Sequence, residues 1–246
     1  MYIDLYFDEL KKVLEKIEET QKKTIEECAK VIANSLVNGG AWHIQDSGHM
    51  LMHECIDRSG GLACIKPMTI NINVEDKVRT REGDPAGGFN PYTAPELASL
   101  VVKASKLHKG DVLIIGSTSG YSFFPIELAL EARKQGIVTI CLTALEYSKS
   151  LKSKHPSGLR LFEACDYVLD NCSNCGDAIV HLNEVDKDIA PASGIGAAYI
   201  MWGLQVGVSE ELIKMGKNPA IFKSIHAKDG EKVFREALEQ YATLGY

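Results

Sequence analysis

The sequence predicts an α/β fold with a helical N-terminal extension, and three observations support this class. Residues 112–142 follow the order strand, turn, helix, strand, which is typical of a βαβ unit with parallel strands. Further short apolar runs elsewhere in the chain are candidates for additional strands. Residues 2–38 instead repeat apolar side chains at steps of three, four and seven, which is the spacing of one helical face. We therefore expect a helical segment over 1–38, an α/β domain over 39–225 and a C-terminal helix over 226–246.

The N-terminal segment is amphipathic along its whole length. Lys and Glu side chains occupy the face opposite the apolar one, and Gly39-Gly40 is expected to end the helix. A polar gap between Ile17 and Ile25 leaves open two helices joined by a bend. Because so long a helix has more apolar surface than one small core needs, its spare face is expected to pack on a second copy of the chain.

Between this helix and the central unit, the pattern alternates between short strands and helices. Ala41–Ile44 and Ala63–Ile65 are strand candidates, and a helix is expected over residues 50–58. Residues 68–95 contain several Gly and Pro residues and predict a long loop. A helix is expected from Pro95 to Lys106, with proline in its first turn.

The central unit gives the strongest signal. Val112–Ile115 is a continuous apolar run, as expected for a parallel strand that is buried on both faces. A helix should run from Pro125 to Gln135, followed by a strand at Val138–Leu142. The remaining expected elements are strands at 167–169 and 178–182 and helices at 193–215 and 229–243.

Composition excludes several classes of protein. The 246 residues include 27 Lys and Arg against 33 Asp and Glu, which gives a net charge of −6. A mildly acidic chain matches neither nucleic acid nor an anionic membrane. No stretch approaches the roughly 20 consecutive apolar residues of a membrane-spanning helix. The N-terminal residues also lack the basic-then-apolar order of a secretory signal, so a cytoplasmic location is expected.

The seven cysteines fit that compartment. Their number is odd and most lie in apolar runs, so buried free thiols are expected. Cys172 and Cys175 form a CxxC pair, but a single pair without a second is weak evidence for zinc or redox chemistry.

A turn rich in hydroxyl groups follows the central strand. It carries four candidate phosphate ligands, Ser117, Thr118, Ser119 and Ser122, just before the helix at Pro125. Exposed N–H groups and the positive end of the helix dipole favour an anion at such a position. Capping alone requires one hydroxyl group, and no nucleotide P-loop motif is present. The turn therefore predicts a site for the phosphate group of a small metabolite.

A second polar segment follows the first strand. Its candidate residues are Asp46, Ser47 and Gly48 for substrate binding and His49, His53 and Glu54 for catalysis. On the expected helix, His49 and His53 would share a face at a spacing compatible with a metal, but no third ligand is defined. Acid–base action on a bound sugar is the preferred interpretation, and no metal or other cofactor is predicted. Glu82 lies in the long loop, where a solvated position is the simpler alternative to catalysis.

Several motifs together resemble the sugar isomerase (SIS) domain family. The serine turn matches the signature of that domain, and downstream segments resemble bacterial SIS-domain proteins of about this length. These segments are Pro125–Ala132, Ser148–Ser150, His155–Gly158, Asp170–Cys172 and Gly176–Ala178. The resemblance implies a flavodoxin-like three-layer sandwich with a five-stranded parallel sheet, and a homodimer or higher oligomer. It also implies a phosphorylated sugar as ligand, with Ser117, Ser119 and Ser122 holding its phosphate group and Thr118 close by.

The first turn departs from the pattern of the related proteins. Asp46 and Met50 stand where glycine and serine are usual. A carboxylate beside a phosphate group would repel it, unless that carboxylate receives sugar hydroxyl groups or an amine.

The resulting hypothesis is a phosphosugar aldose–ketose isomerase. Glu82 or Glu54 is the expected base, and His49, His53 or His226 the partner acid or ring-opening group. Glu82-Gly83-Asp84 and Glu54 loosely resemble positions of the N-acetylmuramic acid 6-phosphate etherases. Two alternatives stay open, which are a phosphosugar lyase or etherase and a non-catalytic phosphosugar sensor.

Overall fold

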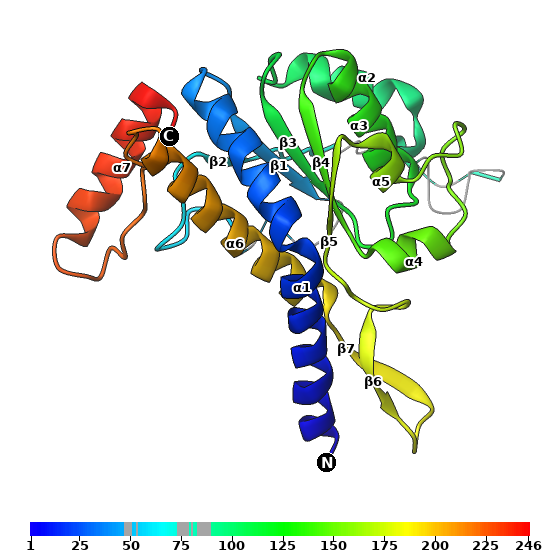
Figure 1. Cartoon of the computed structure of the whole chain (residues 1–246). Coiled ribbons are helices and arrows are strands. Elements are labelled where there is room, and N and C mark those ends of the chain that lie inside the picture. The colour runs from blue at the N-terminus through cyan, green and yellow to red at the C-terminus, as the bar shows by residue number, and fades with distance from the viewer. Residues whose placement is uncertain (47–50, 53, 73–78, 80, 83–89) are drawn as a thin grey trace.

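A five-stranded parallel sheet forms the centre of the molecule (Figure 1). The computed structural model describes residues 1–46, 51–52, 54–72, 79, 81–82 and 90–246. The strand order is β2-β1-β3-β4-β5, which is the flavodoxin-like order. The strands are β1 (Trp42–Asp46), β2 (Ile65–Pro67), β3 (Val112–Gly116), β4 (Val138–Thr143) and β5 (Tyr167–Asp170). The predicted fold class is confirmed.

Helices cover both faces of the sheet and complete three layers (Figure 1). One face carries α1 (Tyr2–Val37) and α6 (Ser193–Lys214), and the other carries α2 (Pro95–Ala104), α3 (Phe123–Lys134) and α5 (Leu161–Ala164). The side chains of β3 alternate between the layers. Val112 and Ile114 join the core under α1 and α6, whereas Leu113 and Ile115 join the core under α2 and α3. Burial on both faces explains the continuous apolar run of this strand.

The N-terminal segment is one helix of 36 residues, so the polar gap does not divide it. Ile17, Cys28, Ile32 and Leu36 are buried in the core that α1 shares with α6. The first turns of α1 extend beyond the sheet, beside the antiparallel hairpin of β6 (Ala178–Leu182) and β7 (Lys187–Pro191) (Figure 1). None of the helices in the described ranges is both long and apolar enough to cross a bilayer.

The last helix, α7 (Gly230–Leu244), packs outside the β2 edge of the sheet. The rings of Phe222 and Phe234 stack there with their centres 4.4 Å apart. Ala63 and Ala237 belong to the same small cluster. This cluster attaches the C-terminal helix to the segment before β2.

Some details differ from the sequence-based expectations. The described residues within 51–58 form turns and bends instead of a helix. Leu51 and Cys55 are buried at the expected spacing, but Asp57 has a φ of 50°, a left-handed conformation that a helix does not tolerate. β6 pairs with β7 and not with the parallel sheet. The pattern also missed four short elements, η1 (Pro91–Thr93), α4 (Leu145–Ser150), α5 and β7, none of which shows a clear period.

Candidate functional site

The carboxyl ends of β1 and β3 lie side by side at the point where the strand order reverses. Gln45 of β1 is paired with Ile115 of β3, and Asp46 with Gly116. In open α/β sheets, ligands bind in the crevice that forms at this position. A cavity of about 840 Å³ opens here. It is lined by Gln45, Asp46, Met52, Met68, Thr69, Ile70, Asn71, Asn90, Tyr92, Thr93, Ser122, Phe123, Phe124, Pro125 and Lys154.

The serine turn, residues 117–122, is held rigidly by neighbouring elements. The Thr143 hydroxyl group lies 2.7 Å from the carbonyl oxygen of Ser117 and 3.0 Å from that of Thr118. The backbone N–H of Leu161 donates to the carbonyl oxygen of Gly120 at 2.7 Å. Gly120 has a φ of +58°, and a Cβ atom there would lie 2.7 Å from the Ser148 hydroxyl oxygen. The turn therefore requires glycine at this position.

The four hydroxyl groups of the turn have different environments. Ser117 is buried, and its Oγ accepts a hydrogen bond from the N–H of Gly120 at 3.3 Å, so it stabilises the turn itself. Ser119 and Ser122 are partly exposed, and within the described part of the chain their hydroxyl groups make no hydrogen bond. Ser122 is the N-cap residue of α3, but its side chain does not cap the helix. Thr118 is partly exposed beside them. Of the four, Ser122 lines the cavity, whereas Ser117, Thr118 and Ser119 do not, so Ser122 is the best placed of the predicted phosphate ligands.

The N-terminus of α3 adds main-chain donors to the same wall of the cavity. The first N–H groups of a helix have no partner within it. Here they belong to Phe123 and Phe124, since Pro125 has none. Both residues line the cavity next to Ser122. Together with the helix dipole, these groups favour an anion.

Lys154 supplies a cation to this wall, and the sequence pattern did not reveal it. Its backbone N–H donates to the carbonyl oxygen of Tyr121 at 2.9 Å, and its Nζ lies 4.7 Å from the centre of the Tyr121 ring. No carboxylate among the described residues forms an ion pair with it. A lysine beside a helix N-terminus is a common phosphate-binding arrangement. The available signal was its position directly before the His155-Pro-Ser-Gly158 segment.

Two polar side chains of β1, Gln45 and Asp46, also line the cavity. Gln45 is 7% exposed, and its Oε1 has no hydrogen-bond partner in the described structure although the side chain lines the cavity. Such a buried acceptor is costly unless a ligand or water satisfies it. The predicted substrate contact Asp46 also lines the cavity. Its Oδ2 accepts hydrogen bonds from the N–H groups of Leu51 at 2.5 Å and Met52 at 3.3 Å. These bonds offset part of the repulsion that this carboxylate would exert on a phosphate group.

Four of the other predicted site residues, Ser47, Gly48, His49 and His53, fall outside the described residues. Glu54 is partly exposed and forms an ion pair with Arg58 at 3.4 Å.

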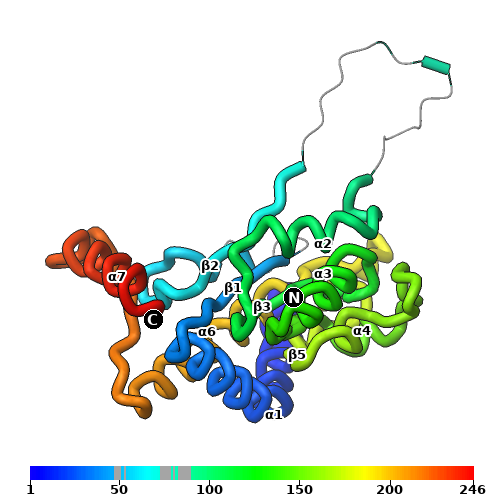
Figure 2. Tube along the Cα trace, turned by 90° about the horizontal axis from the view of Figure 1, so that it is seen from above, coloured from blue at the N-terminus to red at the C-terminus, as the bar shows by residue number. Residues whose placement is uncertain are grey.

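The structure does not bring Glu82 or His226 to the cavity within this chain. Both are exposed, and neither lines it. His226 precedes α7, which lies on the opposite side of the molecule from α3 (Figure 2). The short described segment 81–82 is drawn well away from the sheet in the same view.

No metal centre is assembled by the described residues. No group of three His, Cys, Asp or Glu side chains among them is arranged to hold an ion. All seven cysteines are free, with Cys172 buried and Cys175 exposed. Burial raises the pKa of the Cys172 thiol, which opposes formation of a reactive thiolate.

Comparison with known proteins gives consistent matches. The model of the SIS domain matches residues 5–144. A UPF0309 protein of Oceanobacillus iheyensis is 30% identical over 245 residues, with 98% of this chain and 96% of that protein aligned. A UPF0309 protein of Thermoanaerobacter pseudethanolicus is 31% identical over 242 residues and 96% of each chain.

Two solved structures share the fold at low sequence identity. A phosphoheptose isomerase from Neisseria gonorrhoeae aligns with a TM-score of 0.52 and 18% identity, covering 84% of this chain and 97% of that one. A phosphoheptose isomerase from Francisella tularensis aligns with a TM-score of 0.50 and 16% identity, covering 85% and 96%.

Proposed function

Because the chain belongs to the SIS domain family, and within it to the UPF0309 proteins, we propose that it binds a phosphorylated sugar at the carboxyl ends of β1 and β3 and isomerises it between aldose and ketose. The observation that best supports this proposal is the cavity wall formed by Ser122, the first N–H groups of α3 and Lys154. These donors converge on one side of a cavity of about 840 Å³, which is large enough for a sugar phosphate.

The position of the sugar follows from that of the phosphate group. With the phosphate group at α3, the carbon chain extends towards β1, where the Gln45 side chain lines the cavity. Asn71, Asn90 and Thr93 add further hydrogen-bonding groups to the cavity. These side chains carry no charge, so they suit hydroxyl and carbonyl groups better than a second anion.

Isomerisation requires a base that removes the proton next to the carbonyl carbon and an acid that stabilises charge on the oxygen. We assign the base to Glu82 or Glu54 and the acid to His49, His53 or His226; Glu82 and His226 do not line the cavity of this chain, so either of them would have to act from a second copy of the chain. A base must come within about 3 Å of the proton that it removes. Asp46 is the carboxylate that already lines the cavity, so Asp46→Asn is the informative comparison for Glu82→Gln and Glu54→Gln.

Binding is tested first, by thermal-shift titration with a panel of sugar phosphates, their unphosphorylated parents and inorganic phosphate. A ligand at 100 times its dissociation constant stabilises the folded state by about 2.7 kcal/mol. We expect one class of sugar phosphate to raise the melting temperature while its parent sugar does not. If no phosphorylated compound raises it, the proposed ligand class is wrong.

Catalysis is tested with the sugar phosphate that binds, by NMR detection of deuterium uptake from D₂O next to the carbonyl carbon. The wild-type protein should exchange this proton, and the variant that lacks the base should bind the compound without exchange. If Glu82→Gln and Glu54→Gln both exchange the proton fully and Asp46→Asn does not, Asp46 is the base. Elimination of a substituent would identify a lyase, and binding without exchange would identify a sensor.

A further inference from the structure

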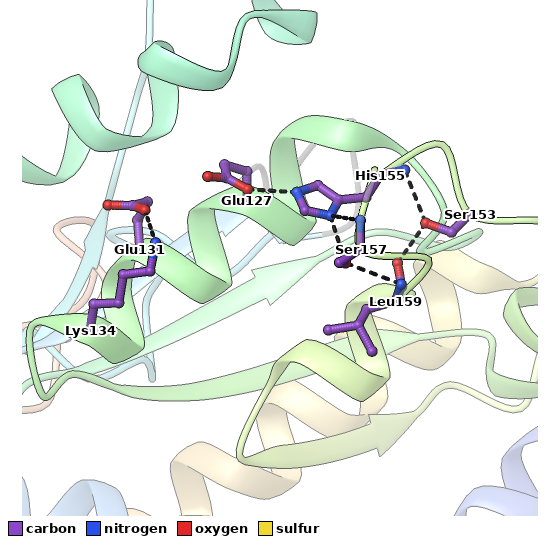
Figure 3. Close-up of polar contacts among 7 residues, drawn as sticks. All are labelled: Glu127, Glu131, Lys134, Ser153, His155, Ser157 and Leu159. Carbon is purple, nitrogen blue, oxygen red and sulfur yellow. Dashed lines mark hydrogen bonds and ion pairs between the residues drawn. The ribbon is translucent and has the colours of Figure 1, made fainter.

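A hydrogen-bonded network outside the cavity connects α3 to the segment 153–159 (Figure 3). His155 Nε2 lies 2.5 Å from Glu127 Oε2, and His155 Nδ1 lies 2.7 Å from Ser157 Oγ. The backbone N–H of Ser157 also donates to Nδ1, at 3.2 Å. Since Nδ1 accepts that bond, Nε2 carries the proton that is donated to Glu127. The side chains of His155 and Glu127 are 7% and 18% exposed, which is unusually buried for this pair of residue types.

The network fixes His155 to the first two turns of α3. Its ring lies against Phe123, with ring centres 4.9 Å apart, and Glu127 follows Phe123 by one helical turn. Ser153 closes the other side of the segment, because its Oγ donates to the carbonyl oxygen of Leu159 at 2.6 Å and accepts the N–H of His155 at 3.0 Å. The segment is thus rigid and attached to the same helical turn that provides the anion-binding N–H groups.

Lys154 lies between two points of attachment. On one side its own N–H is bonded to the Tyr121 carbonyl oxygen in the serine turn. On the other side the next residue is His155, which is held by Glu127. The backbone is therefore held on both sides of Lys154. As a result, the point from which its flexible side chain extends has a fixed position at the cavity wall. Less rotational freedom is then lost when its ammonium group binds an anion.

We propose that Lys154 binds the phosphate group of the substrate and that His155 and Glu127 are positioning residues that hold it there. This inference rests on the proposed phosphate site at α3 and extends it by naming the cation and the network that orients it. His155 itself does not line the cavity, so its effect on binding must be indirect, and we infer that it passes through Lys154 instead of through the first turn of α3.

The test measures the dissociation constant of inorganic phosphate by ³¹P NMR titration of the full-length protein. The variants are Lys154→Met, Lys154→Arg, His155→Gln, Glu127→Gln and the double variant Lys154→Met/His155→Gln. Glu131→Gln is the matched control, because Glu131 lies one turn further along α3 and forms an ion pair with the exposed Lys134 (Figure 3). Each variant is also compared with the wild-type protein by its melting temperature.

We expect Lys154→Met to weaken phosphate binding about tenfold and to flatten its salt dependence, and Lys154→Arg to retain both. His155→Gln and Glu127→Gln should each weaken binding about threefold to tenfold, whereas Glu131→Gln should not. The decisive comparison is the double variant, in which His155→Gln should change the affinity less than twofold once Lys154 is absent.

Different failures have different meanings. If His155→Gln lowers the melting temperature but leaves phosphate affinity unchanged, the network is only structural and the inference is wrong. An equal loss in the presence and absence of Lys154 would also overturn it. If His155→Gln does not fold, Glu127→Gln against Glu131→Gln decides the same question. If the wild-type protein binds neither inorganic phosphate nor any sugar phosphate, the proposed function itself fails.

Discussion

The carboxyl ends of β3 and β5 carry equally polar sequences but use them in opposite ways. At the end of β5, Asp170 is 8% exposed, and its Oδ1 accepts the N–H groups of Leu145 and Cys172, each at 2.9 Å. Asn171, next to it, is fully buried and accepts the N–H of Ser173. At the end of β3, in contrast, the hydroxyl groups of Ser119 and Ser122 make no hydrogen bond within the described structure. Polar groups at a strand end thus indicate a ligand only where the protein leaves them unsatisfied.

The largest effect on stability is expected at the carboxyl end of β5, where the polar side chains are hydrogen-bonded within the protein. Asp170→Ala removes the acceptor of two backbone N–H groups, of which one begins α4. We expect the free energy of unfolding in urea to fall by about 3 kcal/mol. Phosphate affinity of the folded variant should stay within twofold of the wild-type value. If Asp170→Ala instead weakened phosphate binding and left the unfolding free energy unchanged, the contrast drawn between the ends of β5 and β3 would be wrong.

Gly120 is expected to have the next largest effect, because it shapes the serine turn. In Gly120→Ala, the added Cβ would lie 2.7 Å from Ser148 Oγ and 3.1 Å from Thr143 Oγ1, in a left-handed conformation. We expect a loss of about 2 kcal/mol in unfolding free energy and weaker phosphate binding. Gly158→Ala is the control, since its φ of +76° is similar but nothing lies within 4 Å of its Cβ. Equal losses in both variants would show that contacts at Gly120 do not matter.

Ser122→Ala should have the opposite effect to Asp170→Ala: it should weaken phosphate binding and leave stability nearly unchanged. Because the Ser122 side chain does not cap α3, its removal should change the unfolding free energy by no more than about 0.5 kcal/mol. Phosphate affinity should fall about tenfold, as measured by the same ³¹P titration. Ser150→Ala is a suitable control, since that exposed hydroxyl group lies outside the cavity, donates to the Tyr147 carbonyl oxygen and accepts only a long contact from Cys175 Sγ at 4.0 Å. Unchanged affinity in Ser122→Ala would remove this residue from the phosphate site.

The smallest effect is expected at the amino-terminal ends of β1 and β3, where His43 Nε2 lies 3.5 Å from Asp111 Oδ2. Burial lowers the pKa of His43 below its usual value of 6.5, and Asp111 opposes this only in part. The unfolded chain therefore takes up the proton first, so stability contributed by neutral His43 is complete above pH 6.5 and declines as the pH falls towards the folded-state pKa. In His43→Gln, the slope of unfolding free energy against pH just below 6.5 should be smaller than in the wild-type protein. A steeper slope in the variant would reverse the assigned direction.

Much of the fold was predictable because its signals are local. The apolar run Val112–Ile115 indicated a strand buried on both faces, and the helical period of residues 2–37 marked α1. The expected helix over 50–58 was wrong, since the spacing of Leu51 and Cys55 is equally satisfied by a buried turn.

The site was predictable only where a motif marked it. The hydroxyl-rich turn was located from its composition and its place before a helix. The role of Lys154 and the contact between Glu127 and His155 were not predicted, because the resemblance named the segments Pro125–Ala132 and His155–Gly158 but carries no information about the tertiary contacts between them. The roles of Glu82 and His226 rested on loose motif similarity and on chemistry, and neither carries information about which residues line the cavity. Their roles stay predictions.

The pairing of α1 with α6 has a consequence for the order in which the protein can fold during synthesis. Ile17, Ile32 and Leu36 are covered by a helix that begins only at Ser193. While the ribosome makes the intervening residues, α1 has emerged but its apolar face lacks the helix that covers it in the folded protein. Contacts between such distant segments slow folding and prolong the exposure of apolar surface. A nascent chain arrested before residue 193 should therefore bind chaperones, and release should follow the synthesis of α6.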